Sequence, residues 1–357
     1  MGRDANPLQR PMSVRTSLES ILTRSWLQRG VVAWLLLPLA LLYRFVSRVH
    51  RGWYACGLGA RQTATVPVIV VGNVVAGGAG KTPVVMALVE HFKQQGWSVG
   101  IVSRGHGRRH GGATMVHAAM SADDVGDEPL LLAQRCHVPV AVARRRMAAV
   151  HLLLHTHPHT QLIVSDDGLQ HHAMQHDVAL CVFDERGTGN GWPLPAGPLR
   201  EAWPRQPWPG SVQFVTHTGG VNPPDGFRIT RQLAPHALNG RGDTRALTHW
   251  TSQPVTAIAG IAHPARFFAL LQQQGVNVAT PLPLPDHAGR EQLARALIDV
   301  PPGQAVLCTE KDAVKLWPSH PEVWAVPLHT ELPPDLLTRI DEVVAAKLSL
   351  RHGQQTA

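Results

Sequence analysis

The fold is decided by two neighbouring stretches, Val66-Pro-Val-Ile-Val-Val71 and, five residues further on, Gly77-Gly-Ala-Gly-Lys-Thr82. The first is a short β-branched run, typical of a central parallel strand. After the second, apolar residues from Val84 to Phe92 recur at helical spacing until Gly96 ends the pattern. A glycine-rich turn between a buried strand and a helix lets backbone N–H groups surround phosphate oxygens. The sequence therefore predicts a phosphate-binding loop.

The residue types in this loop predict a nucleoside triphosphate with Mg²⁺. Lys81 is expected to reach the β- and γ-phosphates, and the Thr82 hydroxyl to bind the metal ion. The common motif begins with glycine, whereas Val75 stands at that position here. The alternative is a glycine-rich turn that contains Gly-Lys-Thr by coincidence, but its place between strand and helix favours nucleotide binding. The predicted nucleotide-binding residues are Val75, Ala76, Gly77, Gly78, Ala79, Gly80, Lys81 and Thr82.

Two adjacent acids end a later apolar stretch, Leu162-Ile-Val-Ser-Asp-Asp167. In phosphate-loop proteins an acid at this place binds Mg²⁺, directly or through water. Two crowded carboxylates also need a cation to offset their repulsion. We therefore predict that Asp166 and Asp167 are metal-binding, although the sequence does not decide which one touches the ion. The alternative is a solvated turn at Asp167-Gly168.

Working outward, strand and helix patterns alternate over the whole chain, which predicts an α/β fold with a doubly wound, mostly parallel sheet of the phosphate-loop NTPase type. Between 187 and 210, six Pro, five Gly and three Trp predict a linker or a long functional loop. A second, smaller α/β domain follows. The predicted units are a basic apolar arm (1–61), the nucleotide-binding core (62–210), the smaller domain (211–330) and a C-terminal helix with its tail (331–357).

The composition of the 357-residue chain, 44% apolar and 16% charged, excludes a disordered or fibrous protein. Of the net charge of +8, residues 1–61 carry +7, so the rest is almost neutral and a nucleic-acid partner is not expected. Four scattered Cys without a CxxC pair predict reduced thiols in a cytosolic compartment, with neither a zinc site nor a redox site. The alternating His155, His157 and His159 lack a Cys or carboxylate at ligand spacing, so no metal is expected there.

The arm contains the 13-residue apolar run Val31–Tyr43, which is short of the roughly 20 residues that a spanning helix needs. We predict an interfacial helix at a membrane surface, with a buried core helix as the alternative. Aromatic side chains would lie at headgroup depth and arginines would meet lipid phosphates. These residues are Trp26, Trp34, Tyr43, Arg24, Arg29, Arg44, Arg48 and Arg51.

Seven motifs in order between about residues 60 and 316 resemble the tetraacyldisaccharide 4′-kinases, the lipid A 4′-kinases of Gram-negative bacteria. They are Gly77–Thr82, Ser103-Arg-Gly-His-Gly-Arg108, Gly126-Asp-Glu-Pro129, Asp166-Asp-Gly-Leu-Gln-His171, Pro195-Ala-Gly-Pro-Leu-Arg-Glu201, Pro285-Asp-His287 and Thr309-Glu-Lys-Asp312. The resemblance implies a monotopic, monomeric enzyme on the cytoplasmic face of the inner membrane. Its reaction would move the γ-phosphate of ATP to the 4′-hydroxyl of a tetraacyldisaccharide 1-phosphate, a glycolipid.

The resemblance also implies roles for individual residues. Asp127 and His287 match the family's base dyad, although by spacing alone Asp127 is better read as a helix N-cap. Closure of the two domains is expected to bring the dyad together. Lys81 and Asp167 are further catalytic candidates. The expected substrate residues are Arg104, His106, Gln170, His171 and Glu201.

Two positions depart from the family pattern, with His106 in place of a usual Tyr and Ala288 in place of a usual His. A different function class stays open: a membrane-associated phosphate-loop switch ATPase with no lipid acceptor. It predicts ATP hydrolysis that lipid does not change, and a dimer that shares nucleotide contacts.

Overall fold

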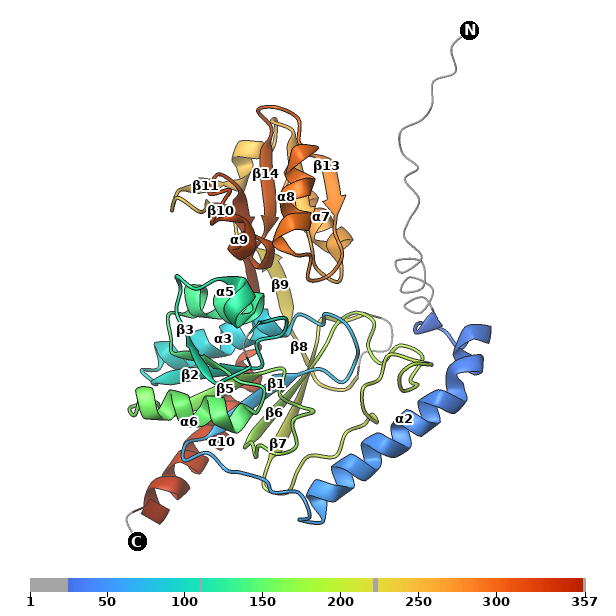
Figure 1. Cartoon of the computed structure of the whole chain (residues 1–357), viewed down its shortest axis with the longest axis vertical. Helices are drawn as coiled ribbons and strands as arrows, with labels where there is room; N and C mark the ends of the chain where they lie inside the picture. Colours follow the sequence, from blue (N-terminus) through green and yellow to red (C-terminus); the bar gives the residue numbers. More distant parts are fainter. Residues whose placement is uncertain (1–24, 110, 221–223, 356–357) are drawn as a thin grey trace.

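The computed structural model describes residues 25–109, 111–220 and 224–355, which form two sheet units and a long separate helix (Figure 1). The first sheet has eight strands in the order β3-β4-β2-β5-β1-β6-β7-β8. Their bounds are β1 (Val68–Gly72), β2 (Val99–Ser103), β3 (Thr114–Val116), β4 (Val140–Val142), β5 (Leu162–Asp166), β6 (Val178–Phe183), β7 (Val212–His217) and β8 (Phe227–Arg228). The strands pair in parallel, except that β3 is antiparallel to β4.

Helices cover both faces of this sheet, as a doubly wound fold requires. One face carries α3 (Lys81–Gln94), α5 (Asp127–Cys136) and the C-terminal α10 (Pro334–Gln355), whose apolar side chains share a core with Ile69 and Val71. The other face carries α6 (Arg146–Thr156), which packs on Val68 and Val70. A single turn, α4 (Ala122–Val125), precedes α5. The predicted α/β class, the parallel sheet and the strand–loop–helix order are confirmed.

The second sheet has six strands in the order β11-β10-β15-β14-β12-β13. They are β10 (His236–Asn239), β11 (Thr244–Ala246), β12 (Val255–Ala259), β13 (Val278–Pro283), β14 (Ala305–Thr309) and β15 (Trp324–Val326). Its helices are α7 (Pro264–Gln273), α8 (Arg290–Ile298), α9 (Glu310–Leu316) and the short η1 (Leu247–Trp250). An antiparallel ribbon of β9 (Thr230–Leu233) and β16 (Leu328–Glu331) lies between the two units (Figure 1).

The unit boundaries differ from the expected ones at two places. Strands β7 and β8 follow residue 210 but extend the first sheet, so the chain leaves that sheet only after Arg228. The helix predicted within 331–357 is present as α10, but it is not a unit of its own, because it packs against the first core. There His91 Nε2 lies 2.9 Å from Asp341 Oδ1, and residues 356–357 lie outside the description. Both differences arise from long-range pairing, which local periodicity does not encode.

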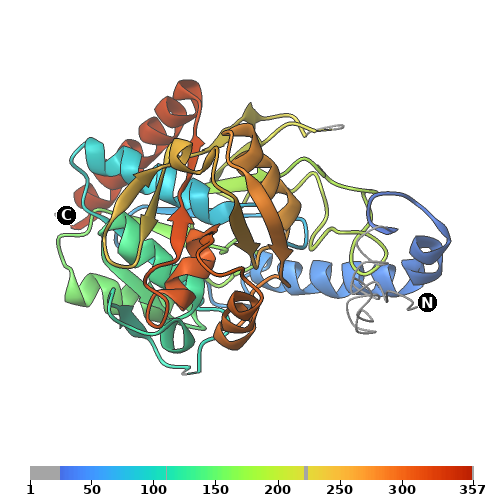
Figure 2. The same cartoon turned by 90° about the horizontal axis from the view of Figure 1, so that it is seen from above.

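The N-terminal helix α2 (Val31–Ala55) lies at the edge of the molecule in both views (Figure 1, Figure 2). It runs for 25 residues, well past the 13-residue apolar run, and includes Pro38. By length and composition it could cross a membrane, with a mean hydropathy of 1.6 and 11% of the best window buried. Only Ala33 and Ala40 are buried, which argues against a core helix. Arg24 lies outside the described residues.

The polar groups expected at lipid headgroups instead contact the 187–210 loop in several cases. Trp26 Nε1 donates to the Pro195 carbonyl at 2.9 Å, and the Tyr43 hydroxyl donates to the Arg200 carbonyl at 2.7 Å. The Arg51 guanidinium stacks 4.4 Å from the Trp208 ring. Trp34 packs edge-on against Trp192, Arg29 donates to the Asn190 carbonyl, and Arg44 and Arg48 are exposed. The helix is thus held to the body by its polar side chains, while its apolar face stays open.

Candidate active site

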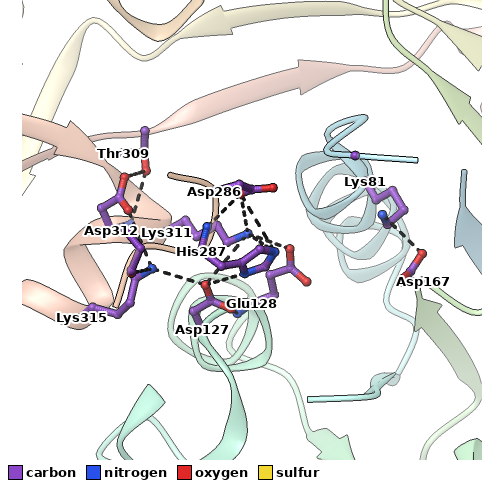
Figure 3. Close-up of polar contacts among 12 residues, drawn as sticks. Lys81, Asp127, Glu128, Asp167, Asp286, His287, Thr309, Lys311, Asp312 and Lys315 are labelled. Atoms are coloured by element: carbon purple, nitrogen blue, oxygen red, sulfur yellow. Dashed lines mark hydrogen bonds and ion pairs between the residues drawn. The ribbon is translucent and has the colours of Figure 1, made fainter. Parts of the chain in front are cut away.

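A cavity of about 380 Å³ lies where the two sheet units meet. One wall is the loop Gly77–Thr82, and the other is built from the second unit around His287 and Lys311. Figure 3 shows the two groups of polar side chains, Lys81 with Asp167 and, apart from them, the residues around His287. A concave site with converging polar groups at the ends of parallel strands is the usual place for a ligand in an α/β fold.

The phosphate loop is set by backbone geometry at the start of α3. Gly80 caps the helix in the left-handed region, with φ of 69°, and Lys81 begins the helix. Lys81 Nζ lies 3.3 Å from Asp167 Oδ1 and donates to Asn73 Oδ1 at 3.2 Å. Asn73 Nδ2 in turn donates to the Gly77 carbonyl at 3.1 Å. Asn73 thus holds both the backbone of the loop and the side chain of Lys81 in position.

The two acids at the end of β5 have different environments. Asp166 is buried, and neither carboxylate oxygen has a hydrogen-bond partner among the described residues. Burial raises the pKa of Asp166 to about 7, and the charge of Glu128 adds to this effect. Burial also acts on Asp167, but Lys81 and Arg200 prevail and lower its pKa. An unpaired buried carboxylate of this kind calls for a cation nearby.

These donors fit a magnesium ion. The Thr82 hydroxyl, in the first turn of α3, and the carboxylates of Asp166 and Asp167 are hard oxygen ligands. Magnesium needs few of them, because phosphate oxygens and water complete its shell. Within 25–109, 111–220 and 224–355, no group of three or more His, Cys, Asp or Glu side chains could by itself hold a metal.

On the opposite wall, Asp127 and His287 are in contact although 160 positions separate them in sequence. His287 Nδ1 lies 3.3 Å from Asp127 Oδ2. Asp127 begins α5, whereas His287 follows β13 and has a positive φ of 58°. The hydrogen bond to Asp127 raises the pKa of His287, against the effect of burial. Burial acts to raise the pKa of Asp127, but His287, Lys311 and Lys315 outweigh it and lower the value.

Two lysines of α9 surround this pair (Figure 3). Lys315 Nζ lies 3.4 Å from Asp127 Oδ2 and donates to the Ala288 carbonyl at 2.9 Å, beneath the pair. Lys311 Nζ lies 3.1 Å from Glu128 Oε1 and 3.3 Å from His287 Nε2, on the cavity side. The arrangement is a carboxylate-oriented imidazole, which is suited to accepting a proton near neutral pH.

The family model described as tetraacyldisaccharide-1-P 4′-kinase matches residues 32–345 of the chain. The chain belongs to the tetraacyldisaccharide 4′-kinase family. The tetraacyldisaccharide 4′-kinase of Acidovorax sp. (strain JS42) is 46% identical over 334 residues, covering 92% of this chain and 95% of the relative. That of Shewanella amazonensis (strain ATCC BAA-1098 / SB2B) is 39% identical, covering 94% of this chain and 100% of the relative.

The fold also agrees with a solved member of the 4′-kinase family. The crystal structure of LpxK from Aquifex aeolicus in complex with ATP superposes with a TM-score of 0.72 at 26% identity. The match covers 88% of this chain and 100% of that chain. The family resemblance read from the seven motifs is therefore confirmed.

In this 4′-kinase family member, the predicted site residues divide into two sets. The cavity lining includes Gly77–Thr82, Arg104, His106, Asp167 and His287, and the His106 ring centre lies 5.4 Å from that of His287. Outside the lining, Asp127 and Asp166 are buried behind it. Val75 and Ala76 pair with Leu199 and Pro198 of the 187–210 loop. The two members of the dyad touch in this structure, and their approach through domain closure stays a prediction.

Three expected substrate residues are not part of the lining. Gln170 Nε2 donates to Glu201 Oε1 at 2.9 Å, and Glu201 also receives a bond from Arg205 at 3.1 Å. His171 is largely covered, and burial with the nearby Arg146 lowers its pKa to about 4. Gln170 and Glu201 connect β5 to the 187–210 loop from outside the cavity.

Sequence reasoning missed several residues of this 4′-kinase site. Glu128, Asp286 and Lys311 stand inside recognised motifs, but nothing in those motifs assigned them a role. Asn73 and Arg231 carry no motif signal. Arg231, on the ribbon strand β9, lines the cavity and donates to the Ala79 carbonyl at 2.8 Å. Such contacts depend on tertiary structure, which no spacing rule reveals.

Proposed function

We propose that this protein transfers the γ-phosphate of ATP to the 4′-hydroxyl of a tetraacyldisaccharide 1-phosphate. One observation carries the proposal: a single cavity has a phosphate loop with Lys81 on one wall and, on the other, His287, whose Nδ1 contacts the buried Asp127. Phosphoryl transfer needs charge neutralisation and positioning, which the first wall offers. An alcohol acceptor needs a proton acceptor, which the second wall offers. A switch ATPase has no use for a dyad facing the phosphate loop.

The chemistry follows from these side chains. The loop amides and Lys81 bind the triphosphate, and Thr82, Asp166 and Asp167 would hold the Mg²⁺, which neutralises phosphate charge when bound. The 4′-oxygen attacks the γ-phosphorus, the bond from that phosphorus to the β–γ bridging oxygen breaks, and ADP leaves. The hydroxyl proton passes to His287 Nε2, while Asp127 orients the ring through Nδ1. Arg104 and His106 are the lining residues that we assign to the disaccharide.

The location of the reaction follows from the acceptor. Its acyl chains lie in a bilayer, so an enzyme at the membrane surface meets it by diffusion in two dimensions. The exposed apolar face of α2 supplies the attachment, with Arg44 and Arg48 available to anionic lipid. We assign the protein, as a monomer, to the cytoplasmic face of the inner membrane, where ATP is present.

The test is direct. Purified full-length protein is incubated with γ-labelled ATP, Mg²⁺ and the disaccharide 1-phosphate in detergent micelles, and the lipid product is separated. Label in a bisphosphorylated glycolipid supports the proposal. ATP hydrolysis that lipid does not change, with no labelled lipid, overturns it in favour of the switch ATPase.

A further inference from the structure

Lys311 lines the cavity and touches Nε2 of His287, the ring nitrogen that faces away from Asp127. Its Nζ lies 3.3 Å from His287 Nε2, and its side chain is 16% exposed. Glu128 Oε1 lies 3.1 Å from the same ammonium, and carboxylate oxygens of Asp127 and Asp286 each lie 3.9 Å away. One cation therefore sits among three carboxylates and an imidazole (Figure 3).

These contacts specify the protonation of the ring. An ammonium group has only donors, so Nε2 accepts from Lys311 and carries no proton. The ring proton then resides on Nδ1 and is donated to Asp127. This is the neutral tautomer, in which the Nε2 lone pair is the acceptor and contacts Lys311. It is also the form that a base needs before the acceptor hydroxyl arrives.

Asp127 alone would work against that form. A hydrogen-bonded carboxylate favours the charged imidazolium, which cannot accept a proton, and it raises the pKa of His287. Lys311 opposes the same protonation by placing a positive charge at Nε2. The carboxylate that orients the ring thus also favours its inactive charged form, and Lys311 reduces that effect.

We propose that Lys311 is a positioning residue that opposes protonation of His287 and selects the tautomer in which Nε2 is the acceptor. The proposal rests on the proposed function and deepens it. When the substrate hydroxyl takes its place at Nε2, Glu128 holds the displaced ammonium close by. The nearby carboxylates of Glu128, Asp127 and Asp286 keep Lys311 charged both before and after the substrate binds.

The other charged and titratable groups near His287 do not repeat this role. Asp286 Oδ1 lies 4.0 Å from Nε2 and, like Asp127, favours the imidazolium. Lys315 lies beneath the pair and contacts Asp127, and no contact of its ammonium with the ring is found among the described residues. The His106 ring centre is 5.4 Å from that of His287. Among these groups, Lys311 alone places a full positive charge at Nε2.

The experiment compares Lys311→Met, Lys311→Gln and Lys311→Arg with a charge-matched control, Lys347→Met on α10, whose ammonium donates to the Gly210 carbonyl. The acid limb of kcat/KM is measured for each. Removing a charge in contact with the ring should move this limb upward by about one pH unit in the Met and Gln variants. The Arg variant and the control should keep the wild-type limb. A wild-type limb in both uncharged variants overturns the proposal.

A second measurement separates this proposal from the proposed function. The ring of His287 is titrated by NMR in ¹⁵N-histidine-labelled full-length protein without nucleotide or lipid, with His287→Gln used to assign the signal. The pKa of the His287 ring is expected to be higher in Lys311→Gln than in the wild type, by the same amount as the acid limb moves. If the wild type makes no labelled lipid but this rise in pKa occurs, the function fails and the Lys311 assignment stands. An unchanged titration removes the assignment, whatever the kinase assay gives.

Discussion

The two walls of the cavity are built in opposite ways. The phosphate loop is a run of consecutive residues between β1 and α3, positioned by one strand, one turn and one helix. The dyad wall takes Asp127 from α5, His287 from the loop after β13 and two lysines from α9. The geometry of a local motif follows from the spacing of its residues in the sequence. A site assembled from distant segments is defined only by the tertiary fold. Mutations can show whether the two walls contribute separately to ATP binding and to catalysis.

The largest expected effect is on the local wall. Lys81→Ala removes the charge that lies between Asp167 and the incoming phosphates, so lipid phosphorylation should fall roughly 10³-fold. The measurement is kcat/KM for ATP in the labelled-lipid assay. Lys93→Ala, on the same helix but bonded to the Cys136 carbonyl, is the matched control and should keep the wild-type rate. A Lys81 variant within tenfold of wild type would contradict the assigned role.

The assembled wall should respond differently. Asp127→Asn keeps the shape of the side chain but removes the charge that orients His287, so kcat should fall roughly 10²-fold. ATP affinity should stay within about twofold, and His287→Ala should behave alike. Asp123→Asn, which alters a carboxylate paired with the exposed Arg109, is the control.

The same variant has a pH signature. Protonated imidazole cannot act as a base, so the wild-type kcat/KM should decline as the pH falls through a His287 pKa held above its ordinary 6.5 by Asp127. Asp127→Asn removes this effect, and the acid limb should move to lower pH. Loss of Lys311 should move the acid limb to higher pH instead. Limbs that move in the same direction in both variants would refute the opposed roles.

The comparison of the two walls also explains how much of the fold and of the site the sequence alone could predict. The run Val66–Val71, the glycine turn and the apolar spacing to Phe92 were enough to predict a strand, a phosphate loop and a helix, because each signal is local. The pairing of β7 with β6, the return of α10 to the first core and the contact of Lys311 with His287 all join distant segments. The motif order supplied the dyad through family resemblance, and no spacing rule connects Asp127 with His287.

Helix α2 offers a test outside both walls. Leu35 is 76% exposed on its apolar face, and Leu35→Asp should lower partition onto anionic vesicles about tenfold, because one buried leucine contributes roughly 1.5 kcal/mol. Activity on a detergent-dispersed acceptor should not change. Leu350, 62% exposed on α10, provides the matched substitution, and Leu350→Asp should bind vesicles as the wild type does. Equal losses in the two variants would mean that α2 is not the attachment surface.

The smallest expected effect concerns the closing helix of the chain. Arg351 Nη2 lies 2.9 Å from both carboxylate oxygens of Asp177, which also accepts from the Val68 amide at 2.9 Å. The pair joins α10 to the entry of β1, so Arg351→Ala should lower the free energy of unfolding by about 1 kcal/mol and Tm by about 2 °C. Arg295→Ala, exposed on α8, is the control. If α10 were an independent tail, both variants would melt together at the wild-type temperature. A lower Tm for Arg351→Ala alone would instead mean that residues 174 positions apart stabilise one core, just as the dyad joins residues 160 positions apart.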